Sequence, residues 1–252
     1  MAKIIAIVNQ KGGVGKTTTC VNLAAAIKAA GKRVLLCDFD PQANATSGMG
    51  VDKTTSNGVY DALINGAETA QLIVTTPYGD VLPSSKALAG AGVEMINMED
   101  RQFLLKAALR QVAANYDYIF IDCPPALSKN TYNALVAASK ILIPVQMEAL
   151  SVKGVSEVLS VMDEVKEFHM NDNLELLGLL PVMVDERTKI TKQLSKLLGE
   201  KHGDLILPCR IRRSVKFLEA QAHGQSIFEY APYSSTGIDY EIAIKRMFNI
   251  KI

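Results

Sequence analysis

Residues 3–19 read KIIAIVNQKGGVGKTTT. The apolar, β-branched run at 3–8 predicts a buried strand, and the glycines after it predict a tight turn. From residue 16 an alanine-rich segment continues to about Ala30 and predicts a helix. A strand, a glycine-rich loop ending in Gly-Lys-Thr and a helix, in that order, form the pattern of a phosphate-binding loop.

The residue types in this loop suit an anion. Because glycine has no Cβ, backbone N–H groups can turn towards a phosphate and approach it closely. The start of the helix adds unpaired N–H groups and the positive end of its dipole. We expect Lys16 to reach the β- and γ-phosphates and the Thr17 hydroxyl to bind Mg²⁺. The predicted phosphate contacts are Gly12, Gly13, Val14, Gly15, Lys16, Thr17 and Thr18.

Length and composition limit the class of protein. With 252 residues the chain predicts one α/β domain, 1–252, with a full core. The net charge of +1 indicates neither a basic tail nor an acidic substrate. Four widely spaced cysteines predict reduced thiols and a cytoplasmic protein. We expect no signal peptide, and no apolar run approaches the roughly 20 residues that span a bilayer.

Strand-like runs alternate with helical stretches, which predicts a mostly parallel sheet with helices on both faces. The predicted strands are 3–8, 33–37, 81–82, 118–121, 141–145, 176–184 and 205–207. The predicted helices lie near 16–30, 86–97, 99–114, 131–138, 151–168, 188–201, 214–222 and 236–248. Residues 52–58 and 65–79 are expected to form surface loops.

Acidic residues follow two predicted strands, at the edge where an open α/β sheet places its ligand. Asp38 and Asp40 occur in DFDPQAN, directly after the predicted strand at 33–37. Asp122 closes the apolar run before Cys123-Pro124 and has the form of a carboxylate that holds a Mg²⁺-bound water. A plainer alternative for the first pair is helix capping.

KGGVGKTT resembles the deviant Walker A box of the ParA/MinD/NifH group of P-loop ATPases. The standard box has glycine where this chain has Gln10, and Lys11 is the group's additional lysine. DFDPQAN resembles the ParA switch I segment, and the region around Asp122 resembles switch II. The likeness covers essentially the whole chain. It implies a P-loop NTPase fold of the SIMIBI type, with ATP and Mg²⁺ as cofactors.

The resemblance also implies roles for single residues. Lys11 would cross a dimer interface to the partner's nucleotide, and Asp40 would position or activate the attacking water, so the predicted catalytic set is Lys11, Lys16 and Asp40. Asp122 and Thr17 would hold Mg²⁺, with Asp38 near Lys16 and the Mg²⁺ shell. The family places adenine against a proline segment, which nominates Pro208 and Arg210, although Pro208 can equally be a strand-ending proline.

Residues 187–216 form a basic segment in a nearly neutral chain. Nine basic and two acidic residues give this segment a charge of about +7, against about −6 for the remainder. Either it is a solvated surface, or, as the charge asymmetry and the ParA likeness favour, it contacts the DNA backbone without reading bases. The predicted DNA-binding residues are Arg187, Lys189, Lys192, Lys196, Arg210, Arg212, Arg213 and Lys216.

Together these features resemble a ParA/Soj-like partition ATPase of the cytoplasm and nucleoid. The resemblance implies an ATP-dependent homodimer that binds DNA non-specifically. It also implies slow hydrolysis, which a ParB-like partner stimulates to drive chromosome or plasmid partitioning. The chain lacks the helix-turn-helix extension of larger plasmid-type members, so operator-specific repression is not expected.

Three alternatives remain open. A MinD-like ATPase that positions the division site would need an amphipathic carboxyl-terminal helix, for which 242–252 is a mild candidate. A NifH-like reductase would need cysteines that bridge a cluster across a dimer. A scaffold that binds nucleotide without hydrolysis would not need both Asp40 and Asp122.

Overall fold

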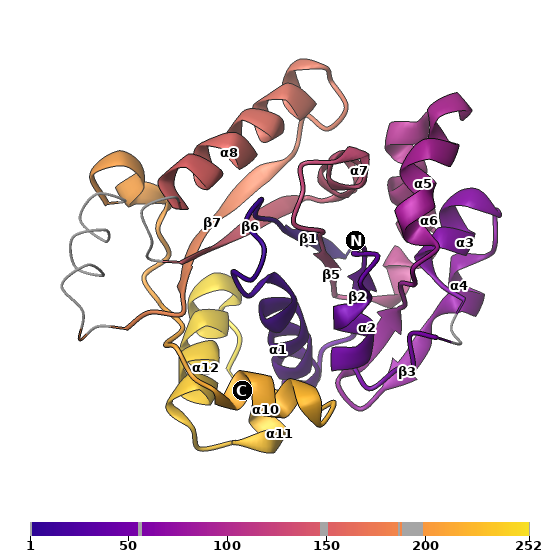
Figure 1. Ribbon diagram of the computed structural model, residues 1–252. Coiled ribbons are helices and arrows are strands. Elements are labelled where there is room, and N and C mark those ends of the chain that lie inside the picture. The colour runs from indigo at the N-terminus through magenta and orange to yellow at the C-terminus, as the bar shows by residue number, and fades with distance from the viewer. Residues whose placement is uncertain (1, 55–56, 147–150, 186, 188–198, 252) are drawn as a thin grey trace.

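The computed structural model describes residues 2–54, 57–146, 151–185, 187 and 199–251. Its centre is a seven-stranded sheet with the order β3-β4-β2-β5-β1-β6-β7 (Figure 1). Neighbouring strands are parallel except for β3 and β4, an antiparallel hairpin at one edge. The predicted α/β class is therefore confirmed. The strands are β1 (Lys3–Ile7), β2 (Val34–Asp38), β3 (Val74–Thr76), β4 (Gly79–Leu82), β5 (Tyr118–Asp122), β6 (Lys140–Gln146) and β7 (Glu175–Val182).

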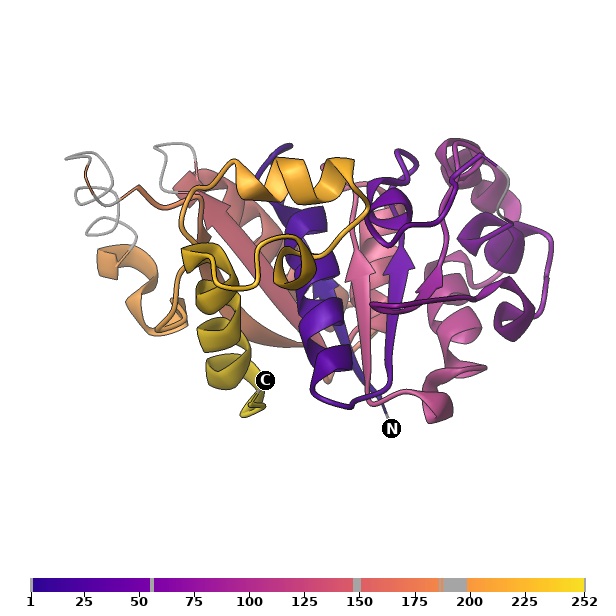
Figure 2. The same ribbon diagram turned by 90° about the horizontal axis from the view of Figure 1, so that it is seen from below.

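Helices cover both faces of the sheet (Figures 1 and 2). Among the described residues, no helix is both long and apolar enough to cross a bilayer. The helices are α1 (Lys16–Ala29), α2 (Asn44–Gly48), α3 (Val59–Ile64), α4 (Thr69–Leu72), α5 (Leu88–Glu94), α6 (Leu104–Arg110), α7 (Lys129–Ala137), α8 (Ser151–Glu167), α10 (Lys216–Ala222), α11 (Ile227–Tyr230) and α12 (Ser235–Phe248).

Alternate side chains of the central strands enter two hydrophobic clusters, one on each face of the sheet. On β5, Ile119 and Ile121 join the cluster covered by α5 to α8, whereas Phe120 joins the cluster covered by α1 and α12. Because both faces are covered, β2 and β5 are buried along their whole length.

The register of the sheet brings the predicted site together. Ile7 at the end of β1 pairs with Asp122 at the end of β5, and Asp122 in turn pairs with Asp38 at the end of β2. Three segments that are far apart in the sequence therefore end side by side, at the edge where the glycine loop begins.

Some predicted elements differ in the structure. The strand predicted at 205–207 is wrong, because Gly203–Leu205 form a 3₁₀ turn and Ile206 makes only an isolated bridge to Leu179. The loop predicted at 65–79 contains α4 and β3. Helices α2, α3 and α11 were also missed, since at four to six residues they are too short to show a helical period. Most of the helix predicted near 188–201 lies outside the described residues.

Gly79 begins β4 with a φ of +120°, a conformation that other residues rarely adopt. An added Cβ would lie 2.6 Å from Val34 Cγ1 and 3.2 Å from Val34 O. We expect Gly79→Ala to lower the free energy of unfolding by about 1–3 kcal/mol, through overpacking and strain. Urea unfolding measures the change. Gly92→Ala in α5 is the control, because nothing lies within 4 Å of its added Cβ; equal stability of the two variants would contradict this account.

Candidate nucleotide-binding site

The glycine loop joins β1 to α1, as the sequence predicts. Gly13 and Gly15 have φ values of 71° and 82°, so the backbone turns sharply at both. Gly15 directly precedes α1, whose start has no side-chain cap. Its first N–H groups therefore suit an anion. Val14 between the two glycines is buried, while Gly12 and Gly13 are exposed at the rim.

The two lysines of the loop have different surroundings. Lys16 is buried, and its Nζ donates to the backbone oxygen of Lys11 at 3.1 Å. Desolvation lowers the pKa of Lys16, an effect that the nearby carboxylates of Asp122 and Asp40 partly offset. The Nζ of Lys11 donates to Gln146 Oε1 of the same chain at 2.9 Å. Reaching a partner's nucleotide would require Lys11 to leave Gln146.

Asp122 meets the loop through Thr17. The Thr17 hydroxyl donates to Asp122 Oδ2 at 2.7 Å, and the Cys20 thiol donates weakly to Oδ1 at 3.5 Å. Asp122 is fully buried, and this desolvation, with the nearby charge of Asp38, raises its pKa. A carboxylate and a hydroxyl at the mouth of a phosphate-type loop are ligands that Mg²⁺ prefers.

The same geometry limits how a metal could bind. Within the described part of the chain, no three His, Cys, Asp or Glu side chains are grouped to hold a metal ion by themselves. Mg²⁺ is commonly bound by one or two carboxylates together with substrate phosphates. Thr17 and Asp122 therefore fit an ion that arrives with a nucleotide.

Asp38 anchors the segment that carries Asp40. Its Oδ1 accepts the Asp40 N–H at 3.2 Å, and its Oδ2 accepts both the N–H and the hydroxyl of Thr46 at 2.7 Å each. Thr46 Oγ1 also accepts the Ser84 N–H at 3.0 Å. Asp38 is fully buried, and desolvation raises its pKa. These contacts favour a structural role for Asp38 in place of the predicted contact with the Mg²⁺ shell.

Asp40 lies at the same edge of the sheet and is 8% exposed. Its Oδ1 accepts the Gln42 N–H at 2.9 Å, which fixes the carboxylate against its own turn. It also lies close enough to Lys16 to act on that ammonium electrostatically. The structure thus brings Lys16, Thr17, Asp40 and Asp122 into one site.

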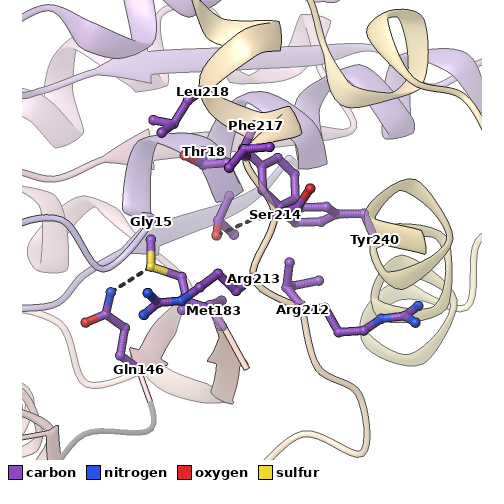
Figure 3. A pocket seen from close by; sticks show the side chains of 14 residues that line it. Gly15, Thr18, Gln146, Met183, Arg212, Arg213, Ser214, Phe217, Leu218 and Tyr240 are labelled. Carbon is purple, nitrogen blue, oxygen red and sulfur yellow. Dashed lines mark hydrogen bonds between the residues drawn. The ribbon is translucent and has the colours of Figure 1, made fainter. Parts of the chain in front are cut away.

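A cavity of about 450 Å³ lies next to the loop, within the size range of small-molecule sites (Figure 3). One end is formed by the start of α1, and the other by aromatic side chains of α10 and α12. Tyr240 lies within hydrogen-bond distance of Thr19, 3.2 Å between the two oxygens. The lining residues are Gly15, Thr18, Thr19, Gln146, Val182, Met183, Ile211, Arg212, Arg213, Ser214, Val215, Phe217, Leu218 and Tyr240.

The predicted adenine contacts lie elsewhere. Pro208 and Arg210 line a different cavity of about 310 Å³, together with Pro181, Val184, Ile206, Leu207 and Cys209, none of which belongs to the loop. The structure therefore places Pro208 and Arg210 outside the cavity beside the loop, whereas residues 211–215, 217 and 218 line that cavity. Sequence reasoning missed Met183, Phe217 and Tyr240, because no local motif marks a residue that reaches a site from a distant element.

The predicted DNA-binding residues have diverse surroundings. Arg212 is bound to the buried Asp239 of α12, with 2.7 Å between Nη2 and Oδ1, so the structure gives it an internal role. Arg187 binds Asp185, and Lys216 binds Glu219. Arg210 and Arg213 are exposed. Lys189, Lys192 and Lys196 lie outside the described residues.

Comparisons with known proteins show the family of this chain. A family profile described as an AAA domain matches residues 2–176. The chain is 45% identical over 237 residues to the sporulation initiation inhibitor protein Soj of Bacillus subtilis, covering 93% of each chain. It is 40% identical over 249 residues to the chromosome partitioning protein ParA of Myxococcus xanthus, covering 98% of this chain and 87% of that one.

Among solved structures, cobyrinic acid a,c-diamide synthase from Mycobacterium smegmatis, with a bound ATP analogue and magnesium, has a TM-score of 0.81 and 32% identity. The match covers 94% of this chain and 98% of that one. The sequence relatives extend over both the phosphate loop and the carboxyl-terminal elements that line the cavity. This chain belongs to the Soj/ParA family of chromosome-partitioning ATPases.

Proposed function

We propose that this protein hydrolyses ATP with Mg²⁺, and that the ATP-bound form is a homodimer that holds DNA non-specifically during chromosome or plasmid partitioning. The observation that carries the proposal is the meeting of Lys16, Thr17 and Asp122 at the glycine loop, with the Thr17 hydroxyl 2.7 Å from Asp122 Oδ2. The M. smegmatis structure, with its ATP analogue and magnesium, supports the choice of cofactors.

The chain's own residues would divide the chemistry as follows. Backbone N–H groups of 12–18 and the Lys16 ammonium bind the phosphate oxygens. Thr17 and Asp122 orient Mg²⁺, which, when bound, withdraws charge from the β- and γ-phosphates. Asp40 orients the attacking water, and Asp38 holds the Asp40 segment through Thr46. The cavity beside Gly15 and Thr18 receives the nucleoside.

Dimerisation would use Lys11. When two copies face each other, its ammonium would exchange Gln146 for the phosphates of the partner's nucleotide. Two basic surfaces on one dimer bind DNA more tightly than either alone. A ParB-like protein would speed hydrolysis and so release the dimer. The protein would then be found in the cytoplasm, associated with the nucleoid.

The structure gives less support to the MinD-like and NifH-like alternatives. In α12, Tyr240, Ala243 and Ile244 are buried in the core, and only Ile238 and Ile242 of its large apolar side chains are exposed, which is little surface for a membrane. Cys20, Cys37 and Cys123 are buried, which does not suit a metal cluster shared across an interface.

The first test removes the proposed water-orienting carboxylate. We expect Asp40→Ala to bind Mg-ATP but to hydrolyse it at least about 100-fold more slowly, the scale of a lost acid–base group. It should accumulate as a dimer in sedimentation velocity and hold DNA persistently at low salt. Adding Lys16→Ala in the same chain should abolish ATP binding and with it the dimer. An Asp40→Ala protein that stays monomeric in Mg-ATP would contradict the proposed cycle.

The second test concerns the basic segment. Replacing Lys189, Lys192 and Lys196 by Gln should lower the DNA affinity of the ATP-bound form by the same factor for DNA duplexes of unrelated sequence. The slope of log K against log salt should become shallower by about 0.9 for each phosphate that the variant no longer neutralises. Lys28→Gln with Lys32→Gln is the control, since these exposed lysines lie at the opposite end of α1 from the loop. A sequence-dependent loss would argue against backbone contact.

The third test separates Arg212 from the DNA surface. Arg212→Gln leaves the buried Asp239 carboxylate without its guanidinium partner, and should lower the free energy of unfolding by about 1–3 kcal/mol. Thermal and urea unfolding measure this loss. Unchanged stability together with weaker DNA binding would instead assign Arg212 to the DNA surface.

A further inference from the structure

Arg212 and Arg213 are neighbours in the segment that lines the cavity, but their side chains point apart (Figure 3). The Arg212 guanidinium turns away to Asp239 of α12. The Arg213 side chain points away from Asp239, towards the end of the cavity that Gln146, Met183 and Gly15 line (Figure 3). The two arginines of this pair therefore have separate functions.

The backbone explains this divergence. Val184 N–H donates to Ile211 O, Arg213 N–H donates to Val184 O at 3.1 Å, and Val184 bridges Arg212 in parallel. Side chains alternate in such an extended segment, so fixing Arg212 on α12 sends Arg213 to the other side. The orientation of Arg213 is thus a consequence of the Arg212–Asp239 ion pair.

Met183 connects Arg213 to the glycine loop. Its φ is +52°, and its Sδ accepts the Gln146 amide N–H at 2.7 Å. Its Cε lies 3.7 Å from the position of a Cβ added to Gly15. Gln146 donates to Gly13 O at 3.2 Å. Arg213 and Met183 line the same cavity, and that cavity adjoins Gly15. The Arg213 guanidinium is therefore on the side from which it can approach an anion bound by the loop.

The charged side chains around Arg213 and the loop favour a contact between Arg213 and an anion bound by the loop. Among the described carboxylates, Asp185 is the one on which the Arg213 charge acts, and Arg187 donates to both Asp185 oxygens, at 2.9 and 2.7 Å. The carboxylates of Asp122 and Asp40 already lie close enough to Lys16 to act on its charge. A triphosphate at this place needs positive charge beyond Lys16, and Arg213 is exposed and lines the cavity.

We propose that Arg213 is a nucleotide-binding residue, whose guanidinium binds the phosphate chain of ATP from the cavity side of the glycine loop. This rests on the proposed function, in which the loop binds ATP. Guanidinium groups suit phosphate oxygens because they donate two parallel, charge-assisted hydrogen bonds. Arg213 then belongs to the nucleotide site and leaves the set of predicted DNA contacts.

The test compares nucleotide affinity among full-length variants. Arg213→Gln should raise the Kd for Mg-ATP and Mg-ADP about tenfold, the size of one missing charge-assisted hydrogen bond. Arg213→Lys should recover part of the affinity. Arg246→Gln is the matched control, because Arg246 is an exposed arginine in the last turn of α12 and does not line the cavity. Fluorescence titration with a labelled ATP gives each Kd.

A second measurement separates the proposal for Arg213 from the proposed function of the protein. DNA affinity is compared at saturating Mg-ATP in the Asp40→Ala background, where Arg213→Gln should bind DNA as its parent does. An unchanged Kd for Mg-ATP with weaker DNA binding would overturn the assignment of Arg213 and leave the proposed function standing. A parent protein that binds no ATP would instead refute the proposed function. Without nucleotide, Arg213→Gln and its parent should unfold at the same temperature, since the Arg213 side chain is exposed.

Discussion

A carboxylate buried at the carboxyl end of β5 determines how the site is built. Asp122 is fully buried, and a lone charge there would be costly, so its neighbours must compensate. The Thr17 hydroxyl and the nearby Lys16 ammonium do so in part. The remaining imbalance is one that a divalent cation relieves. The parallel register that places Asp122 beside Ile7 and Asp38 is therefore the constraint on which the rest of the site depends.

The second carboxylate of the edge acts through the backbone. Asp38 ties the start of α2 to the end of β2 through Thr46, and Thr46 continues the connection to Ser84 after β4. The turn that carries Asp40 is thus fixed at both ends by buried hydrogen bonds, which are stronger and more specific in a low-dielectric interior. The water-orienting role that we propose for Asp40 needs such support, because a free loop would not hold the carboxylate in place.

Much of this site could be predicted from the chain, and the reason is locality. The loop at 11–18 and Asp122 at the end of an apolar run are defined by residues close in sequence, so their patterns survive without tertiary information. The parallel sheet followed from the same alternation of strands and helices. The strand predicted at 205–207 failed because apolar residues alone do not decide pairing: Ile206 bridges Leu179 and the ladder goes no further.

The cavity beside the loop could not be predicted in this way. Met183 follows β7, Phe217 belongs to α10 and Tyr240 to α12, and only the packed structure shows that they line one cavity with Gly15. The basic segment showed a similar limit. Its net charge follows directly from the sequence, but charge alone could not distinguish Arg212, bound to the buried Asp239, from Arg213 in the cavity wall.

The position of this wall along the chain also limits how the protein can be divided. The AAA-domain match ends at residue 176, whereas the cavity residues outside the loop begin with Gln146 and continue to Tyr240. A fragment trimmed to the matched region would keep the glycine loop but lose most of the cavity wall, which the proposed function assigns to the nucleoside. In the proposed function, the loop that binds the phosphates is thus encoded in the first half of the polypeptide, whereas most of the cavity wall, Arg213 included, is encoded in the second half.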